Sequence, residues 1–348
     1  MKVLIYTDLQ AAESHERLFA NPSVPLQRWR IRHFYKELWK VYQKFECEAL
    51  WDLGDTTDDR NSLPIPTIHE VLEGLKPFPT VPENIKLIGN HEQFLRSTEM
   101  HVGNLFEGKF TVVPKHQVLA AGGTKIVCLS YHDNSQEATA WLAQHAKEGT
   151  VVLGHGQILG CRMNSGLSME GIPKKAFQSA DLTLFGHVHS RQEVAPKVFY
   201  VGSPFQQDHG EAEDSKYVVV LDLKTLELEW VELEGFPHYA TVGLVDFLAN
   251  ISAESEDRLK VVLRNQSEAE TFYAHPLSHR AVPIYEYVSL QAPVVIGDQP
   301  ATVTSDQSID SLLKSYLRKV PPSTKGILLS DHDMLSYGME IVDSACQG

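Results

Sequence analysis

Two histidines one residue apart, His187 and His189, follow the apolar run 182–185 and the glycine Gly186. Such a run predicts a short buried strand that stops at the glycine, so both histidines are expected at its carboxyl end. Imidazole is the commonest transition-metal ligand in proteins, and two alternate imidazoles can reach two neighbouring ions. An isolated H-x-H pair is more often a pair of surface-loop histidines, so its interpretation depends on the other strand ends.

Four other apolar runs end in residues of the same chemical kind. They are followed by Asp8-Leu-Gln10, Gly54-Asp55, Gly89-Asn90-His91 and Gly154-His155. In layered α/β folds, ligands bind outside the carboxyl ends of the strands. Each motif is weak alone, but the set predicts that these side chains converge on one site.

The order of these motifs resembles the calcineurin-like metallophosphoesterase superfamily. Its pattern is D-x-H, G-D-x-x-D, G-N-H-E/D, G-H and G-H-x-H, and the chain departs from it at Gln10, where most members carry histidine. The matching blocks are Gly54-Asp-Thr-Thr-Asp58, Gly89-Asn-His-Glu92, Gly154-His155 and Gly186-His-Val-His189. The resemblance covers about residues 1–235. It implies a four-layer α/β fold, a β-sandwich flanked by helices, with a dinuclear metal centre.

The resemblance also implies a set of ligands for two divalent cations. Asp55 would bridge them, with Asp8, Gln10 and His189 completing one ion and Asn90, His155 and His187 completing the other. This mixed oxygen and nitrogen set favours manganese, with iron or zinc as alternatives. Two such ions would activate a water for in-line attack on phosphorus. His91 is the expected general acid, and Asp58 is the second expected catalytic residue.

Gln10 is shared with the manganese-dependent ADP-ribose/CDP-alcohol diphosphatases, which resemble this chain in having D-x-Q. An amide oxygen can ligate, but it is a harder ligand than imidazole and cannot carry positive charge. We therefore expect weaker binding at that ion and a preference that moves from zinc towards manganese.

Three features favour a DNA-repair exonuclease of the SbcD type. Gly202-Ser-Pro204 with Gly210-Glu211 resembles a block that follows G-H-x-H in those enzymes, and Pro64 follows the G-D-x-x-D block with two extra residues. The segment after residue 236 resembles their capping domain, which orients DNA. The short chain indicates a compact form of the kind that phages encode. The resemblance implies an SMC-like ATPase partner (SbcC type) and a homodimer, with the helix expected over 26–46 as a candidate contact.

Two other functions stay open. D-x-Q and the acidic composition favour a metallophosphodiesterase that acts on a small nucleotide or nucleotide diphosphate. A degenerate, non-catalytic scaffold is the other alternative. A protein phosphatase is disfavoured, because those enzymes place arginine directly after G-D-x-x-D, whereas here Asp59 intervenes before Arg60.

The formal charge of −14 over 348 residues argues against a large basic face. DNA-binding surfaces normally cluster lysine and arginine. The segment 28–44 holds six such residues and is interpreted first as a solvated basic face, with a nucleic-acid contact as the alternative.

The chain is expected to be cytoplasmic. No apolar run of about 18 residues predicts a membrane span, and the start, Met1 to Tyr6, is too short for a secretory signal. Four dispersed cysteines without C-x-x-C indicate a reducing compartment.

Strand and helix signals alternate through the first two thirds of the chain. Helices are predicted at 26–46, 67–75 and 135–147, and strands at 2–7, 49–53, 85–88, 117–120, 124–131, 150–153, 182–185 and 198–201, with a hairpin over 217–233. We expect a metallophosphoesterase nuclease domain over 1–235 and a small α+β capping domain over 236–348. Strands near 258–263 and 284–289 and helices near 308–319 and 329–344 would build the second domain.

Overall fold

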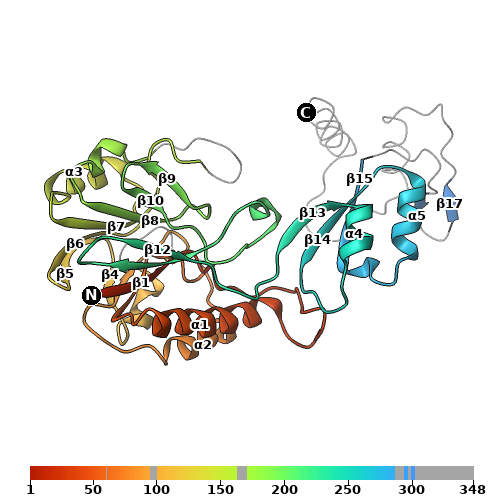
Figure 1. Cartoon of the computed structure of the whole chain (residues 1–348), viewed down its shortest axis with the longest axis horizontal. Coiled ribbons are helices and arrows are strands. Elements are labelled where there is room, and N and C mark those ends of the chain that lie inside the picture. Colours follow the sequence, from red (N-terminus) through yellow and green to blue (C-terminus); the bar gives the residue numbers. More distant parts are fainter. Residues whose placement is uncertain (60, 95–99, 163–170, 287–293, 297–298, 302–348) are drawn as a thin grey trace, which may run out of the picture. The chain divides into compact units, whose positions relative to one another are not determined.

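The computed structural model of the chain (Figure 1) describes residues 1–59, 61–94, 100–162, 171–286, 294–296 and 299–301. It divides into two compact units, one of residues 1–261 and 276–282 and the other of 262–275 and 283–348. The domain boundary expected near residue 235 stays a prediction. The helices predicted near 308–319 and 329–344 lie outside the described residues.

Two six-stranded sheets form most of the first unit. The first has the order β12-β11-β1-β2-β3-β4, and the second has the order β5-β6-β7-β8-β10-β9. The strands of the first sheet are β1 (Lys2–Tyr6), β2 (Ala49–Asp52), β3 (Ile85–Leu87), β4 (Thr111–Val113), β11 (Val218–Asp222) and β12 (Leu228–Val231). Those of the second are β5 (His116–Ala121), β6 (Thr124–Leu129), β7 (Thr150–His155), β8 (Leu182–Gly186), β9 (Gln192–Ala195) and β10 (Val198–Tyr200).

Neighbouring strands at the centre of both sheets run parallel. In the first sheet β1 pairs with β2, β2 with β3 and β3 with β4 in parallel. In the second, β6, β7, β8 and β10 are likewise parallel. Parallel neighbours place their carboxyl ends at the same edge, so the loops after β1, β2, β3, β7 and β8 can build one site.

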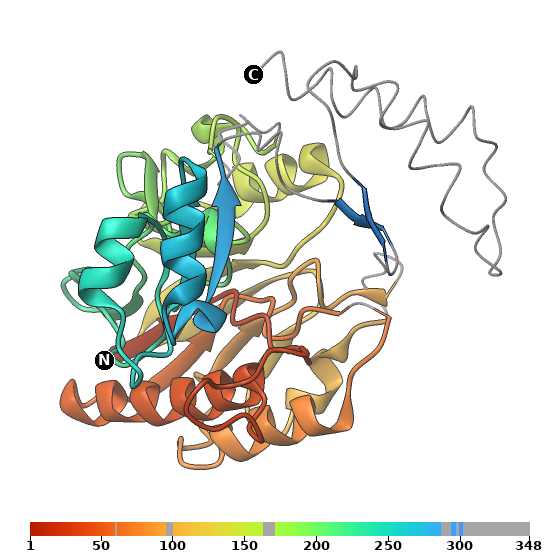
Figure 2. The same cartoon turned by 90° about the vertical axis from the view of Figure 1, so that its right-hand side faces the viewer.

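The two sheets pack face to face, with helices on their outer faces (Figure 2). Val3, Trp51 and Cys128 belong to the apolar layer between the sheets. The outer face of the first sheet is covered by α1 (Leu26–Lys44) and α2 (Ile65–Leu75), and that of the second by α3 (Ser135–His145) and the short helix η3 (Lys174–Phe177). The predicted α/β sandwich flanked by helices is confirmed.

Helix α1 corrects one interpretation of the sequence. Arg30 was expected on a solvated face, but it is only 1% exposed, and its guanidinium lies over the rings of Phe205 and Tyr239. Apolar residues at helical spacing bury this side of α1, and the arginine stem is covered with them. Two neighbouring arginines form ion pairs, Arg28 with Glu13 and Arg32 with Glu70.

The remaining elements follow residue 238. They are β13 (Tyr239–Gly243), α4 (Leu244–Asn250), β14 (Arg258–Leu263), α5 (Gln266–Ala274), η5 (Ser278–Arg280), β15 (Ala281–Tyr285), β16 (Val294–Ile296) and β17 (Gln299–Ala301). β14 is where the sequence predicted it, whereas β15 begins three residues before 284, and α4 and α5 were not predicted. Both helices are short, and α5 is weakly amphipathic, which gives little periodic signal.

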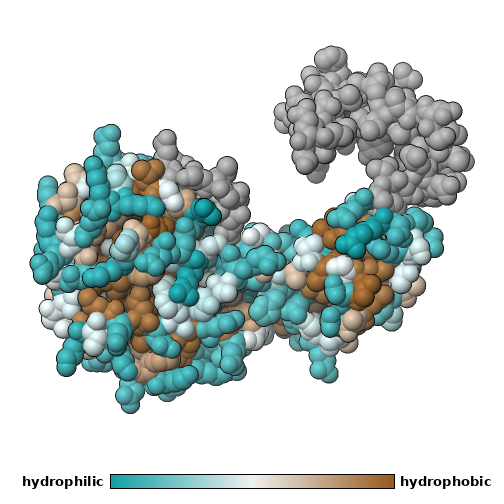
Figure 3. Space-filling model, turned by 45° about the horizontal axis from the view of Figure 1, so that its top comes forward, coloured by the Kyte–Doolittle hydropathy of each residue, from teal (hydrophilic) through white to brown (hydrophobic). Residues whose placement is uncertain are grey.

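The surface drawn in Figure 3 is mainly hydrophilic, with smaller apolar areas between the polar side chains. Within the part of the chain that the structure describes, no helix combines the length and apolar character that crossing a membrane requires.

Candidate metal centre

All seven predicted metal ligands lie at or just after the carboxyl ends of strands. Asp8 and Gln10 follow β1, Asp55 follows β2 and Asn90 follows β3, while His155 ends β7 and His187 and His189 follow β8. Four of these residues have a left-handed backbone: Asp8 (φ 52°), Gln10 (48°), Asp55 (54°) and His187 (93°). Non-glycine residues adopt this conformation at a cost, and such strain clusters at functional sites.

Asp55, Asn90, His155 and His187 form one group of ligand atoms. His155 Nε2 lies 3.2 Å from Asp55 Oδ2 and 3.3 Å from Asn90 Oδ1. His187 Nδ1 lies 2.6 Å from the same amide oxygen of Asn90. Ligand atoms of Asp55, His155 and His187 are all within 4.8 Å of one another.

Asp8, Gln10 and His189 form the adjoining group. His189 Nε2 is 3.8 Å from Asp8 Oδ1 and 3.0 Å from the Gln10 amide nitrogen. His155 Nε2, 4.0 Å from Asp8 Oδ1, links this group to the first. The structure therefore brings all seven predicted ligands into one cluster.

The donor set fits two divalent cations. The side chain of Asp8 is fully buried and that of Asp55 is 1% exposed, and buried carboxylates are costly unless they are paired or coordinate a metal. The cluster adds two side-chain amides and three imidazoles, which together make the mixed set that manganese, iron and zinc accept. His155 Nδ1 lies 2.7 Å from the carbonyl oxygen of Leu53 and donates to it, which leaves Nε2 facing the two carboxylates.

The protonation states of the cluster reflect burial and charge. Burial raises the pKa of Asp55, but the charges of His155 and His91 outweigh it and lower the pKa to about 2. Burial lowers the pKa of His155, yet Asp55 and Asp8 outweigh it and raise this pKa to about 9. Burial and repulsion from His155 lower the pKa of His187 to about 3. A cation that binds His155 must replace its proton, so binding is coupled to proton release.

The two predicted catalytic residues contact each other at the edge of the cluster. His91 Nδ1 lies 2.7 Å from the carbonyl oxygen of Asp58 and 3.0 Å from its Oδ1. The hydrogen bond to Asp58 is the main reason that the pKa of His91 rises to about 9. The backbone N–H of His91 donates to Asp55 Oδ1 at 2.8 Å, which ties its loop to the expected bridging carboxylate.

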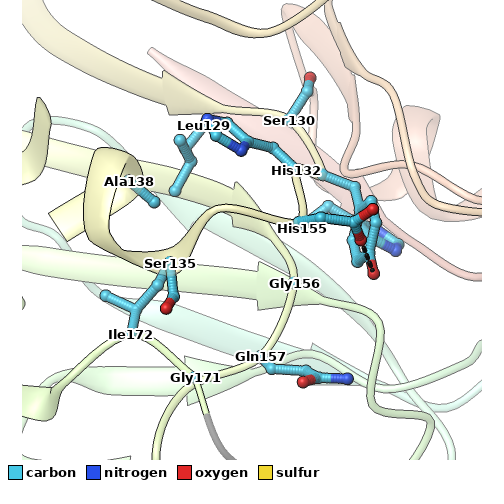
Figure 4. A pocket seen from close by; sticks show the side chains of 12 residues that line it. Leu129, Ser130, His132, Ser135, Ala138, His155, Gly156, Gln157, Gly171 and Ile172 are labelled. Atoms are coloured by element: carbon cyan, nitrogen blue, oxygen red, sulfur yellow. Dashed lines mark hydrogen bonds between the residues drawn. The ribbon is translucent and has the colours of Figure 1, made fainter. Parts of the chain in front are cut away.

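Two recesses border the cluster. One of about 540 Å³ lies beside His91, and carboxylates of Glu13, Asp58 and Asp59 line it. The other, of about 140 Å³, lies beside His155 and is shown in Figure 4. Gln157 lines this second recess, and its side-chain Nε2 lies 3.3 Å from His187 Nε2. Gln157 was not singled out from the sequence, because a lone glutamine after Gly-His carries no recognisable signal.

A second missed residue, Glu211, lies behind His189. Its Oε1 is 2.6 Å from His189 Nδ1, and its Oε2 is 2.6 Å from Lys216 Nζ. Burial would raise the pKa of Glu211, but the bonds from His189 and Lys216 lower it to about 2. The sequence did contain the signal, since Gly210-Glu211 belongs to the block that resembles the SbcD-type enzymes.

A buried ionic network supports the loops after β2 and β3. Lys86 Nζ lies 2.8 Å from Asp52 Oδ2 and 2.8 Å from Glu92 Oε1, and the three side chains are at most 1% exposed. Glu92 accepts hydrogen bonds from the backbone N–H groups of Asp55, Thr56 and Gly89. The lysine therefore neutralises the carboxylate that holds the two loops together. A lysine within a strand is usually solvent-exposed, so its role could not be predicted.

Two glycines are required by close packing at the centre. A Cβ atom at Gly89 would lie 2.0 Å from Asp55 Oδ1, and one at Gly186 would lie 2.0 Å from Thr7 Oγ1. Any larger residue would displace the expected bridging carboxylate or the residue before Asp8.

The chain belongs to the calcineurin-like phosphoesterase family, whose model matches residues 1–191. Two viral proteins are similar to it. "Putative phosphoesterase 078R" of invertebrate iridescent virus 3 is 23% identical over 212 residues, which cover 58% of this chain and 60% of the viral protein. "Putative phosphoesterase 244L" of invertebrate iridescent virus 6 is 25% identical over 130 residues, 35% of this chain and 45% of that protein. The chain thus spans about half to three fifths of these relatives.

Among solved structures, a dimetal phosphatase from Danio rerio is similar in part. It has a TM-score of 0.41 and 11% identity, and the match covers 63% of this chain and 91% of that one.

Proposed function

We propose that this chain is a manganese-dependent nuclease that hydrolyses phosphodiester bonds of DNA, working as an exonuclease of the SbcD type. The observation that carries this proposal is the contact between Glu211 and His189. It connects the block that resembles SbcD-type exonucleases directly to an expected metal ligand. Family membership supports the broader step, hydrolysis of a phosphoester with divalent metals.

Different residues of the chain have different roles in such a reaction. Cations held by the seven ligands would supply a water activated for attack and would offset charge on the phosphoryl oxygens. Asp58 accepts the Nδ1 proton of His91 and so fixes the ring. The other ring nitrogen, Nε2, is then the atom that can donate a proton to the leaving oxygen.

A basic recess supports a DNA substrate despite the acidic composition. It has a volume of about 420 Å³, and Arg17, His209, Arg258, Lys260 and Arg280 line it together with Glu16, which pairs with Arg258. His209 and Glu211 belong to the same short helix, η4 (His209–Glu211), so this recess adjoins the residue behind His189. Arg258 and Arg280 are only 9% and 5% exposed and lie over the Phe19 ring. Arg17 and Lys260 are the more accessible cations, and they can contact the phosphates of a strand whose end lies at the metal centre.

A phosphodiesterase for a small nucleotide or nucleotide diphosphate is the second candidate. The recess beside His91 favours it, because the carboxylates of Glu13, Asp58 and Asp59 would repel the further phosphates of a polynucleotide. An SMC-like ATPase partner, a homodimer and a cytoplasmic location stay predictions. The outward side of α1, the candidate dimer contact, carries exposed Arg32, Lys36, Lys40 and Lys44.

Three substrates separate the candidates when the protein is incubated with Mn²⁺. They are end-labelled linear single-stranded DNA, the same DNA as a duplex, and bis-p-nitrophenyl phosphate. A DNA nuclease degrades labelled DNA and the small ester, and products that shorten from one end identify an exonuclease. If the small ester is cleaved but the DNA stays intact, the nuclease proposal is overturned and the nucleotide phosphodiesterase is favoured. If neither substrate is cut, a non-catalytic scaffold is the better account.

A further inference from the structure

A second group of histidine and glutamate side chains contains none of the seven expected ligands, although its His132 lines the recess beside His155. His116 begins β5, His132 follows β6, and Glu137 lies in the first turn of α3. β5 and β6 are antiparallel, with His116 opposite Leu129, so the hairpin brings His116 close to the loop that carries His132. Ligand atoms of the three side chains all lie within 4.8 Å of one another.

Two nitrogens of this group are buried without a hydrogen bond. They are His116 Nδ1 and His132 Nε2, which have no hydrogen-bond partner among the described residues. The side chain of His132 is only 7% exposed, and its Nε2 lies 3.3 Å from Glu137 Oε2. Buried polar atoms are normally hydrogen-bonded, so a group that leaves two buried ring nitrogens without a hydrogen bond needs an explanation.

We propose that His116, His132 and Glu137 bind one zinc ion. Two imidazoles and one carboxylate form a known zinc ligand set, with water in the fourth position. The ion would give the buried His132 Nε2 a partner and would fasten the β5–β6 hairpin to the start of α3. The proposal is independent of the proposed function, because none of these residues belongs to the centre at the strand ends.

Two existing interactions must give way when zinc binds. Lys115 Nζ lies 2.5 Å from Glu137 Oε1, but both side chains are about 40% exposed (39% and 41%), so the lysine can turn into solvent at little cost. The backbone N–H of Asn134 donates to His132 Nδ1 at 3.0 Å, which places the ring proton on Nε2. Zinc at Nε2 requires this proton to be on Nδ1, so the hydrogen bond from Asn134 opens. The Asn134 amide therefore reports occupancy of the site.

The first test counts zinc per chain after dialysis of the full-length protein against buffered zinc. His132→Gln and Glu137→Gln are expected to hold one ion fewer than wild type. His145→Gln is the matched control, because His145 lies next to the group but contacts it through Trp141, whose ring is 3.8 Å from His145 and 4.3 Å from His116. Equal zinc in wild type and both test variants, or the same loss in His145→Gln, would overturn the proposal. The test compares variants, so the outcome does not depend on ions at the other centre.

The second test uses Trp141 and Asn134 as local reporters. Cobalt should quench the part of the tryptophan fluorescence that Trp141→Phe removes, and Glu137→Gln should abolish that quenching. Zinc should also shift the Asn134 amide resonance in wild type and not in Glu137→Gln. Glu137 is half-exposed, so this variant is expected to fold even if His132→Gln does not. An Asn134 resonance that zinc leaves unchanged in wild type would contradict the site.

Discussion

Glu211 accepts a hydrogen bond from His189, with 2.6 Å between Oε1 and Nδ1. The carboxylate is ionised, because bonds from His189 and Lys216 lower the pKa of Glu211 to about 2 against the effect of burial. The ring proton of His189 is thereby held on Nδ1, and Nε2 is directed towards Asp8 and Gln10. Carboxylates that orient a ligating histidine in this way raise its basicity and fix its tautomer.

Glu211→Gln should therefore weaken metal binding. Loss of such a partner typically lowers metal affinity about 10- to 100-fold, so the Mn²⁺ concentration for half-maximal hydrolysis of bis-p-nitrophenyl phosphate should rise. Saturating Mn²⁺ should restore most of the rate. Glu213→Gln is the control, because Glu213 is an exposed carboxylate two positions along the chain. An unchanged Mn²⁺ requirement in Glu211→Gln would show that this contact does not serve a metal ligand.

Gln10→His should change the preference among metals. The amide nitrogen of Gln10 now faces His189 Nε2 at 3.0 Å, so a cation would bind the amide oxygen after the group turns over. Imidazole is a softer ligand, and the variant should gain affinity for zinc relative to manganese. Parallel titrations of wild type and Gln10→His with the two metals measure this ratio. Identical titrations would contradict a ligand role for Gln10.

His91→Asn should slow cleavage of DNA more than cleavage of bis-p-nitrophenyl phosphate. A general acid contributes about 10²- to 10⁴-fold, but p-nitrophenolate is a good leaving group and needs little protonation. Metal content should be unchanged, since His91 is not an expected ligand. Asp59→Asn, which lines the same recess, is the control. Equal losses on both substrates would rule out proton donation by His91.

Lys86→Met should destabilise the fold. It leaves Asp52 and Glu92 buried without their cation, and removal of one partner from a buried ion pair costs about 3–5 kcal/mol. Lys76→Met is the matched control, because Lys76 pairs with Glu73 on the surface, and such a pair contributes about 0–1 kcal/mol. Urea unfolding measures the free energy of unfolding of both variants. Similar free energies of unfolding for the two variants would contradict the supporting role of Lys86.

Lys260→Ala should weaken DNA binding without affecting the small ester. One lost phosphate contact reduces the slope of log affinity against log salt by about 1. Binding to labelled DNA at several salt concentrations measures this slope, and bis-p-nitrophenyl phosphate reports the metal centre. Lys224→Ala, at an exposed turn position between β11 and β12, is the control. A slope equal to that of wild type would show that Lys260 does not contact DNA.

The candidate centre could be predicted because each ligand follows an apolar run. A buried parallel strand has a continuous apolar sequence, and its end is marked by a glycine or a change in polarity. The sequence thus indicated that Asp8, Asp55 and His187 share one edge, although they are far apart along the chain. It could not give their distances, nor the left-handed backbone that aims these three side chains.

The supporting residues were harder to predict, because their partners come from distant strands. Lys86 is charged, and only its burial between Asp52 and Glu92 explains its presence within β3. Arg30 lies among exposed basic residues, yet the rings of Phe205 and Tyr239 cover it. The group of His116, His132 and Glu137 comes from a hairpin and a helix start, without a characteristic spacing. Such tertiary contacts override local sequence patterns.

Anomalous diffraction from crystals grown with excess Mn²⁺ tests the central claim most directly. Two manganese peaks should lie on either side of the Asp55 carboxylate, one near Asp8 and His189 and the other near Asn90, His155 and His187. Crystals of Asp55→Asn should lose one or both peaks. Wild-type crystals without manganese at these residues, or with the side chains separated from one another, would contradict a dinuclear centre and the hydrolysis proposed from it.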